Sequence, residues 1–155
     1  MPVEIEEMPP QEAHALLARV GYGHLGCARD NRPYVIPIHY AYDEPYIYIF
    51  TTEGMKTEYI NANPQVCLQV EEVEDATHWQ SVVIVGKAER LISPEEIEHA
   101  MQYITRTNPT LTPAISLTWV DVWGRANDIC LYRIVPQVIS GRQTKRAPAT
   151  DEPAN

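Results

Sequence analysis

The residues best suited to hold an anion follow a run of aromatic and β-branched residues that predicts a strand. Thr51 and Thr52 supply hydroxyl donors there, and Gly54 lets a ligand approach the backbone closely. Lys56 adds a positive charge at the start of a short helix that Pro64 ends, where free backbone N–H groups also attract anions. The stretch therefore indicates a phosphate-binding site. In the simpler interpretation, Thr52 only caps the helix and Lys56 is solvated.

The composition limits both the class of protein and its partners. With 155 residues and 17.6 kDa, the chain is expected to fold as one domain with a sizeable core. Its formal net charge of −9 argues against nucleic acid or an anionic membrane as the main partner, but a local positive site is compatible with an anionic cofactor. No apolar run approaches the roughly 18 residues of a membrane span. The acidic N-terminus is unlike a signal peptide, which favours a cytoplasmic protein.

No combination of residue types indicates a metal centre or a nucleophilic catalyst. Cys27, Cys67 and Cys130 lie far apart in apolar runs without a Cys-x-x-Cys pair, so we expect reduced core residues rather than a disulfide or a zinc site. No nucleophile–base pair or carboxylate dyad is recognisable. We therefore expect a cofactor to carry any redox chemistry.

The hydrophobic periodicity predicts a mainly β domain with attached helices. Apolar residues at helical spacing indicate helices over residues 9–20 and 94–105, the second begun by Ser93 and Pro94. Asp30-Asn31 is predicted as a hairpin turn and Gly86 as a bulge. The predicted strands cover residues 22–29, 34–42, 46–50, 65–72, 78–91 and 129–136. Six strands with short links suggest an antiparallel barrel.

Two regions depart from this regular pattern. Residues 107–128 are rich in threonine and proline, and they hold Trp119 and Trp123, which we interpret as core or dimer contacts rather than as a cofactor box. Residues 143–155 are polar and contain proline, so a disordered tail is expected to follow a domain over residues 1–142.

Pro37 is unusual within a predicted strand. It removes a donor from the hydrogen-bond ladder and is tolerated mainly at edges and bulges. Either a flat ligand lies against this backbone, or the segment is an edge strand with nothing bound. His39 follows it, and histidine is the residue type best suited to exchange a proton near neutral pH, so His39 is the best candidate for a proton donor unless the alternation of the strand turns it outward.

Five motifs follow one another in a characteristic order. They are PYVIPI at 33–38, IFTT at 49–52, GMK at 54–56, NPQV at 63–66 and WQSVVIVGKAERL at 79–91. Together they resemble the flavin mononucleotide (FMN)-binding split barrels, the pyridoxamine 5'-phosphate oxidase-like proteins, and within them the branch that includes nitroimidazole-resistance proteins. The resemblance implies a six-stranded antiparallel split β-barrel with peripheral helices, and a homodimer with two flavin sites at its interface.

The resemblance also implies a set of cofactor-binding residues. The two threonines and Lys56 fall where the family binds the flavin phosphate, and residues 35–38 fall on the strand that lines the isoalloxazine ring. Gln80 and Ser81 match positions that contact the flavin, often across the dimer interface. The full implied set is Val35, Ile36, Pro37, Ile38, Phe50, Thr51, Thr52, Met55, Lys56, Gln80 and Ser81.

Three departures from the family pattern concern the substrate. Pro33 stands where pyridoxamine oxidases carry a flavin-binding arginine, with Arg32 one place earlier, and Ile38 replaces a substrate-binding lysine. The Arg-x-His pair that grips the vitamin phosphate near the C-terminus is missing, and the nearest basic feature is Arg142. The sequence therefore argues against synthesis of pyridoxal phosphate.

The leading hypothesis is an FMN-dependent oxidoreductase. It would pass electrons from a nicotinamide nucleotide to a small oxidised substrate such as a nitroaromatic or a quinone, with His39 as the candidate catalytic residue. One alternative is a non-catalytic flavin carrier or sensor. Another is a haem-binding or haem-degrading relative, for which His24 or His39 would supply the axial ligand. A deazaflavin cofactor would use the same phosphate site.

Overall fold

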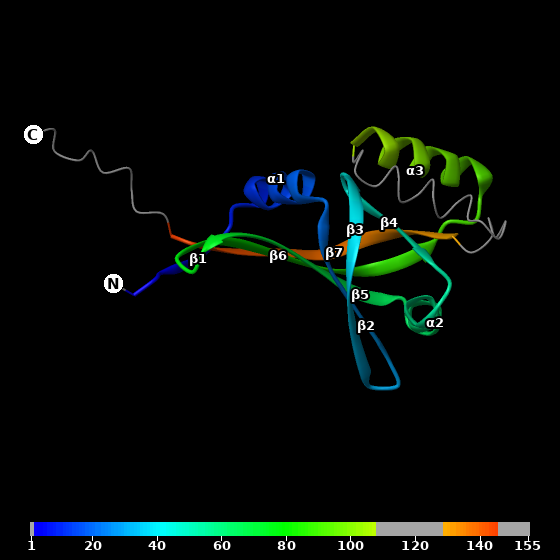
Figure 1. Ribbon diagram of the computed structural model, residues 1–155, viewed down its shortest axis with the longest axis horizontal. Coiled ribbons are helices and arrows are strands. Elements are labelled where there is room, and N and C mark those ends of the chain that lie inside the picture. The colour runs from blue at the N-terminus through cyan, green and yellow to red at the C-terminus, as the bar shows by residue number, and fades with distance from the viewer. Residues whose placement is uncertain (1, 108–128, 146–155) are drawn as a thin grey trace, which may run out of the picture.

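Seven β-strands form one antiparallel sheet, and six of them close into a barrel (Figure 1). The computed structural model describes residues 2–107 and 129–145. The strand order is β1-β7-β4-β3-β2-β5-β6, and a further β6–β7 pairing closes the ring and leaves β1 outside it. The strands are β1 (Ile5–Glu7), β2 (Tyr22–Arg29), β3 (Arg32–Asp43), β4 (Tyr46–Thr52), β5 (Gln65–Asp75), β6 (His78–Arg90) and β7 (Ile129–Thr144).

Three helices flank the sheet in the described part of the chain. They are α1 (Pro10–Val20), α2 (Met55–Ala62) and α3 (Pro94–Thr107). In the view of Figure 1, α1 lies near the end of the sheet that carries β1, and α2 lies toward the opposite end. Within the described residues, no helix is long and apolar enough to cross a membrane.

The core follows the period-2 alternation of the strands. Inward residues such as Leu25, Leu68 and Ile84 are fully buried inside the barrel, where Leu16 and Leu17 of α1 pack against them. A second cluster joins Ala100 and Ile104 of α3 to the sheet residues Tyr48, Leu91 and Leu131. The barrel and both predicted helices are therefore confirmed, and each helix buries one apolar face.

The predicted hairpin and bulge both have a physical cause in the structure. Asp30 and Asn31 adopt φ angles of 51° and 63°, the positive values that a tight two-residue turn between β2 and β3 requires. At the bulge, Val85 pairs with Val138 but Gly86 pairs with Pro136, so β7 carries an extra residue there. A Cβ at Gly86 would lie 2.5 Å from the Val135 carbonyl oxygen, so the close approach needs glycine.

Two boundaries differ from the sequence prediction. The strand count is seven rather than six, because three exposed residues of β1 pair with the end of β7 and show no alternation that would reveal them. The last strand continues past Pro136 to Thr144, since the bulge accommodates the proline. Gln143 and Thr144, placed by the sequence in the tail, therefore belong to β7. Trp119, Trp123 and residues 146–155 lie outside the described residues.

Candidate functional site

The start of α2 is fixed by a buried threonine, Thr57. Its hydroxyl accepts the Gly54 N–H at 2.9 Å, and the same oxygen lies 2.8 Å from the Gly54 carbonyl. The N-cap position of the helix is occupied by Gly54 rather than by Thr52, which differs from the simpler interpretation of the sequence. A Cβ at Gly54 would meet nothing within 4 Å, which leaves open space beside the N–H groups of the first turn.

The residues predicted to bind phosphate differ in their access to this space. Lys56 is half-buried and Met55 is exposed, and both belong to the first turn of α2. Thr51 is buried and pairs with Cys130 of β7. Phe50 packs partly buried against the cluster under α3. The backbone start of α2 and Lys56 are thus the accessible parts of the predicted phosphate site.

Glu53, Arg90 and Cys130 form a polar group next to this helix start, which we call the Glu53 cluster. The Arg90 Nη2 donates to the Glu53 carboxylate at 2.8 Å, and the Cys130 thiol donates to the same oxygen at 3.0 Å. Hydrogen bonds from Cys130 and Arg90 lower the pKa of Glu53, and burial raises the pKa of Cys130 to about 11. Sequence reasoning missed this cluster because it depends on how β6 and β7 are aligned with β4.

One edge of β3 is left unpaired beside α2. Tyr40–Asp43 pair with β4, whereas residues 32–39 pair only with β2 in the described part of the chain. Since the Tyr40 N–H points to β2, where it meets Gly21 O at 3.1 Å, the nitrogen of Pro37 faces the unpaired edge. A proline is well tolerated there because no strand needs its missing donor. The side chain of Tyr34 packs toward the core and contacts Tyr59 of α2, with ring centroids 5.4 Å apart, and α2 itself packs against β2.

The side chains of the predicted ring-lining segment point to two faces. Val35, at 64% exposure, and Pro37 lie on the outer face, whereas Ile38 is buried in the core and Ile36 packs against it. Val35 and Pro37 direct their backbone polar groups to the unpaired edge, whereas those of Ile36 and Ile38 point to β2, and the side chain of Ile38 is not accessible. His39 is exposed on the outer face, where its ring lies 5.2 Å from that of Tyr22. The alternation does therefore turn His39 outward, next to the predicted segment.

Gln80 and Ser81 point in opposite directions from β6. Ser81 accepts a hydrogen bond from Gln69 at 3.1 Å, and Gln69 pairs with His24 on the outer face of the sheet. The side chain of Gln80 lies on the other face, where it donates to Gln143 at 2.9 Å and approaches Arg19 of α1. The structure therefore does not bring these two neighbours to one side of the sheet.

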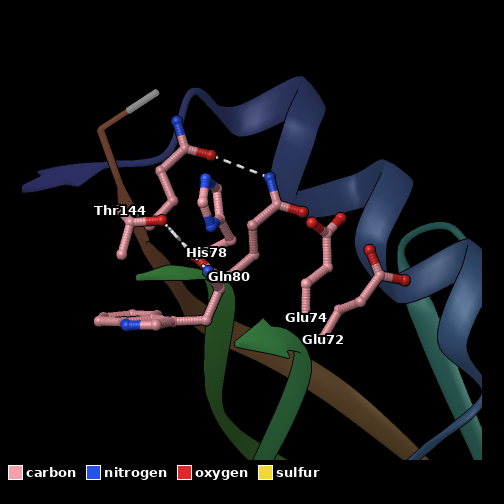
Figure 2. Close-up of a pocket in the computed structure, with 7 residues that line it drawn as sticks. Glu72, Glu74, His78, Gln80 and Thr144 are labelled. Atoms are coloured by element: carbon pink, nitrogen blue, oxygen red, sulfur yellow. Dashed lines mark hydrogen bonds between the residues drawn. The ribbon is translucent and has the colours of Figure 1, made fainter. Parts of the chain in front are cut away.

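A polar cavity of about 340 Å³ lies beside Gln80 (Figure 2). Two carboxylates, Glu72 and Glu74, contribute to its wall, and the Glu72 carboxylate is held by both Nε and Nη2 of Arg19 at 3.1 and 3.0 Å. The cavity is lined by Glu72, Glu74, His78, Trp79, Gln80, Gln143 and Thr144. Its acidic wall makes this end of the sheet unfavourable for a phosphate.

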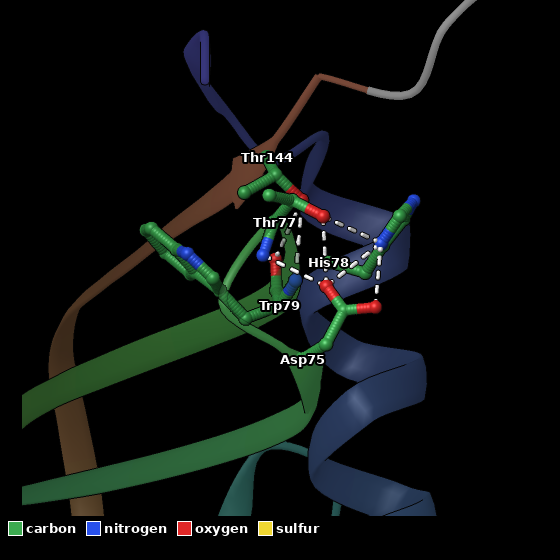
Figure 3. Close-up of polar contacts among 5 residues, drawn as sticks. All are labelled: Asp75, Thr77, His78, Trp79 and Thr144. Atoms are coloured by element: carbon green, nitrogen blue, oxygen red, sulfur yellow. Dashed lines mark hydrogen bonds and ion pairs between the residues drawn. The ribbon is translucent and has the colours of Figure 1, made fainter. Parts of the chain in front are cut away.

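The β5–β6 turn that borders the cavity is ordered by its own hydrogen bonds (Figure 3). Asp75 accepts from His78 at 2.9 Å and from Thr77 at 2.8 Å, and these bonds lower the pKa of Asp75 to about 2. Thr144 of β7 accepts the Trp79 N–H at 3.1 Å. The turn is thereby tied to the end of β7.

The two parts of the predicted site lie at opposite ends of β6. Arg90 contacts Glu53 at the α2 end, and Ser81 lies nine positions earlier in the strand. At about 3.3 Å per residue, the two are separated by roughly 30 Å. Measured along the strand, this separation is longer than a flavin mononucleotide.

A row of small and apolar residues crosses the outer face of the sheet between these ends. Val35 pairs with Gly26, Gly26 with Cys67, Cys67 with Val85, and Val85 with Val138. Val85 and Val138 are 41% and 56% exposed. We call this row, Val35–Gly26–Cys67–Val85–Val138, the outer apolar row. An apolar surface that runs across five strands is typical of a protein–protein contact.

Comparison with known proteins agrees with this architecture. The chain is similar to an FAD-binding protein from Mesorhizobium loti, with 31% identity and a TM-score of 0.74, over 94% of this chain and 100% of that one. The fold also matches a candidate 5-nitroimidazole antibiotic resistance protein from Bacteroides thetaiotaomicron, at 17% identity and a TM-score of 0.72, over 93% of this chain and 90% of that one.

Sequence comparison assigns the family. An uncharacterized protein of Rhizobium meliloti (strain 1021) is 32% identical over 95 residues, which are 61% of this chain and 63% of that protein's length. The family model described as pyridoxamine 5'-phosphate oxidase matches residues 9–143. The chain belongs to the pyridoxamine 5'-phosphate oxidase family, as the order of its motifs predicted.

Proposed function

We propose that this protein is an FMN-binding oxidoreductase that passes electrons from a nicotinamide nucleotide to a small oxidised substrate such as a nitroaromatic or a quinone. The observation that carries the proposal is the start of α2 beside the unpaired edge of β3. The start of α2 favours an anion, and the unpaired edge of β3 offers backbone polar groups to a flat ring. The two are adjacent because Tyr34 packs on Tyr59.

The start of α2 suits a flavin phosphate better than the polar cavity at the other end of β6 does. Gly54 leaves the first-turn N–H groups open, and Lys56 adds a full charge in the same turn. Near the polar cavity at the other end, Arg19 and Lys145 are within reach of Glu72 and Glu4, and Arg142 of β7 pairs with Ser81 of β6. The phosphate is therefore assigned to α2, and the ring to residues 35–38 of β3.

A second copy of the chain completes the site in this proposal. Since Ser81 lies roughly 30 Å along β6 from the α2 end, its contact with a flavin requires the Ser81 of another protomer. The outer apolar row supplies a surface for that copy, because it lies on the same outer face as Ser81, His24 and His39. We therefore propose a homodimer with a flavin at each of two equivalent interface sites.

Bound flavin would supply the redox chemistry. His39 is exposed beside the ring-lining segment and supported by the Tyr22 ring, so it is the candidate proton donor to the reduced acceptor. The sequence lacks the Arg-x-His pair that binds the vitamin phosphate, and the wall of the polar cavity is acidic. Both features favour an uncharged acceptor over a phosphorylated one. We expect a nitroaromatic or a quinone to be reduced faster than a pyridoxine phosphate is oxidised.

Steady-state oxidation of NADH and NADPH by the FMN-loaded protein, with a nitroaromatic or quinone acceptor, tests the activity. The proposal predicts acceptor-dependent turnover that falls at least about tenfold in His39→Gln, with unchanged flavin affinity. The matched control is His99→Gln, an exposed histidine on α3. Stoichiometric flavin binding without turnover on any acceptor would instead identify a carrier or sensor.

A further inference from the structure

We propose that Glu53 is an internal competitor for the flavin phosphate, and that its displacement frees Arg90 to bind that phosphate as a second cation beside Lys56. The inference rests on the proposed flavin site and concerns how that site is regulated. Glu53 immediately precedes the Gly54 N-cap, so its carboxylate lies at the positive end of α2, where an anion is favoured. The carboxylate of Glu53 therefore occupies the position beside α2 where an anion is favoured.

The contacts of Glu53 are those that a bound phosphate would use. Its Oε1 accepts from Arg90 at 2.8 Å and from the Cys130 thiol at 3.0 Å. Its Oε2 lies 3.2 Å from the Thr57 hydroxyl, the group that also caps α2. A guanidinium, a thiol and the hydroxyl of Thr57 in the first turn of α2 thus converge on one carboxylate, and a guanidinium binds phosphate through paired hydrogen bonds at least as well.

The pair is open enough to exchange. The side chains of Arg90 and Glu53 are 38% and 47% exposed, so either can turn toward solvent without unfolding. Half-exposed ion pairs contribute little to stability, whereas a phosphate carries up to two charges and recruits the α2 N–H groups as well. Phosphate therefore displaces Glu53, but because the contacts of Glu53 must first be broken, the net affinity of the site for phosphate is reduced. Cys130 lies 3.3 Å from Arg90 and keeps the guanidinium at the site during the exchange.

The test uses two ligands that differ only in the phosphate. The apoprotein is titrated with FMN and with riboflavin, and flavin fluorescence is followed, for the wild type and for Glu53→Gln. We expect Glu53→Gln to bind FMN about fivefold more tightly and riboflavin within about twofold of the wild type. The matched control is Glu58→Gln, which removes the same charge from an exposed position on α2. We expect it to change FMN affinity by less than about twofold.

A second variant connects the effect to Arg90. Arg90→Gln is expected to weaken FMN at least about tenfold, and Glu53→Gln should give no gain in that background, because the competition is for the guanidinium. Arg90→Lys keeps the charge and guards against a folding defect, and thermal unfolding is recorded for each variant. Inorganic phosphate should compete with FMN at lower concentration in Glu53→Gln than in the wild type.

The outcomes separate the two claims. Wild-type protein that binds neither flavin overturns the proposed function, and this inference with it. Wild-type protein that binds FMN, together with a Glu53→Gln variant whose FMN affinity is unchanged or weaker, overturns only the inference. An equal gain for riboflavin and FMN would also overturn it, since the effect would then not involve the phosphate.

Discussion

The two ends of β6 differ in the charge that they present. At the α2 end, Arg90 and Lys56 lie beside a helix start whose N-cap, Gly54, adjoins open space. At the hairpin end, Glu72 and Glu74 line a polar cavity, and Arg19 is held by Glu72. Both ends hold residues that the sequence assigns to one flavin site. In the proposed site, the flavin phosphate binds at the α2 end, and the hairpin end contributes to a flavin only across a protomer boundary.

The largest effect of a substitution is expected at the proposed dimer interface, which would bring the α2 end of one protomer to the hairpin end of the other. Val85→Asp places a carboxylate in the outer apolar row, and desolvating it should convert the dimer to a monomer at micromolar concentration. FMN affinity should fall with it, because Ser81 of the second copy is lost. Sedimentation velocity measures the oligomeric state, and Val73→Asp, which is exposed outside the row, is the control. A Val85→Asp variant that stays dimeric would place the interface elsewhere.

The next effect concerns the cation of α2. Lys56→Ala should weaken FMN by about tenfold to a hundredfold, or about 1.4–2.7 kcal/mol, while leaving riboflavin binding unchanged. Lys87→Ala removes the same charge from an exposed position on β6 and should have no effect beyond about twofold. Isothermal titration calorimetry measures both. If Lys56→Ala purified with undiminished flavin, the phosphate could not be bound at α2.

Two threonines, Thr57 at the α2 end and Thr77 at the hairpin end, should differ in their contribution to the free energy of unfolding. Thr57→Val removes the buried hydroxyl that caps α2 and should lower the free energy of unfolding by about 1–2 kcal/mol. Thr77→Val removes a hydroxyl from the exposed β5–β6 turn and should cost no more than about 0.5 kcal/mol. Urea denaturation measures both. Equal costs would mean that the α2 start is no more firmly fixed than the hairpin.

The smallest effect is a pH dependence at the hairpin end. Hydrogen bonds from His78 and Thr77 lower the pKa of Asp75 from 3.8 to about 2, so their stabilising contribution is present above pH 4 and is lost as the pH falls toward 2. The unfolding midpoint of Asp75→Asn should therefore lie slightly below that of the wild type at pH 6, and the two should converge near pH 2. A difference that is constant across this range would contradict the assignment.

Local pattern was sufficient to predict most of the fold. The alternation of β2 and β5, the caps of α3 and the Asp30-Asn31 turn are local signals, and each produced an element near its observed bounds. β1 was missed because three exposed residues carry no periodic signal, and β7 was ended early because Pro136 lies at a bulge that depends on its partner strand.

The candidate site was only partly predictable for the same reason. The α2 start and the β3 segment lie near each other in the sequence, and the motif order groups them into one predicted site; in the structure Tyr34 of β3 contacts Tyr59 of α2. The Glu53 cluster joins residues from β6 and β7 that are far apart in the sequence, and only the strand register brings them together. The register also separates Ser81 from α2, which a list of motif residues does not reveal.

The most direct test of the central claim is the visible absorption spectrum of the purified protein, combined with release and mass identification of any bound molecule. The account predicts a yellow dimer that releases FMN at about one per chain. If the protein is colourless, it should take up added FMN to the same ratio. A colourless protein that fails to bind added FMN, or one that shows a haem absorption band, would contradict the account.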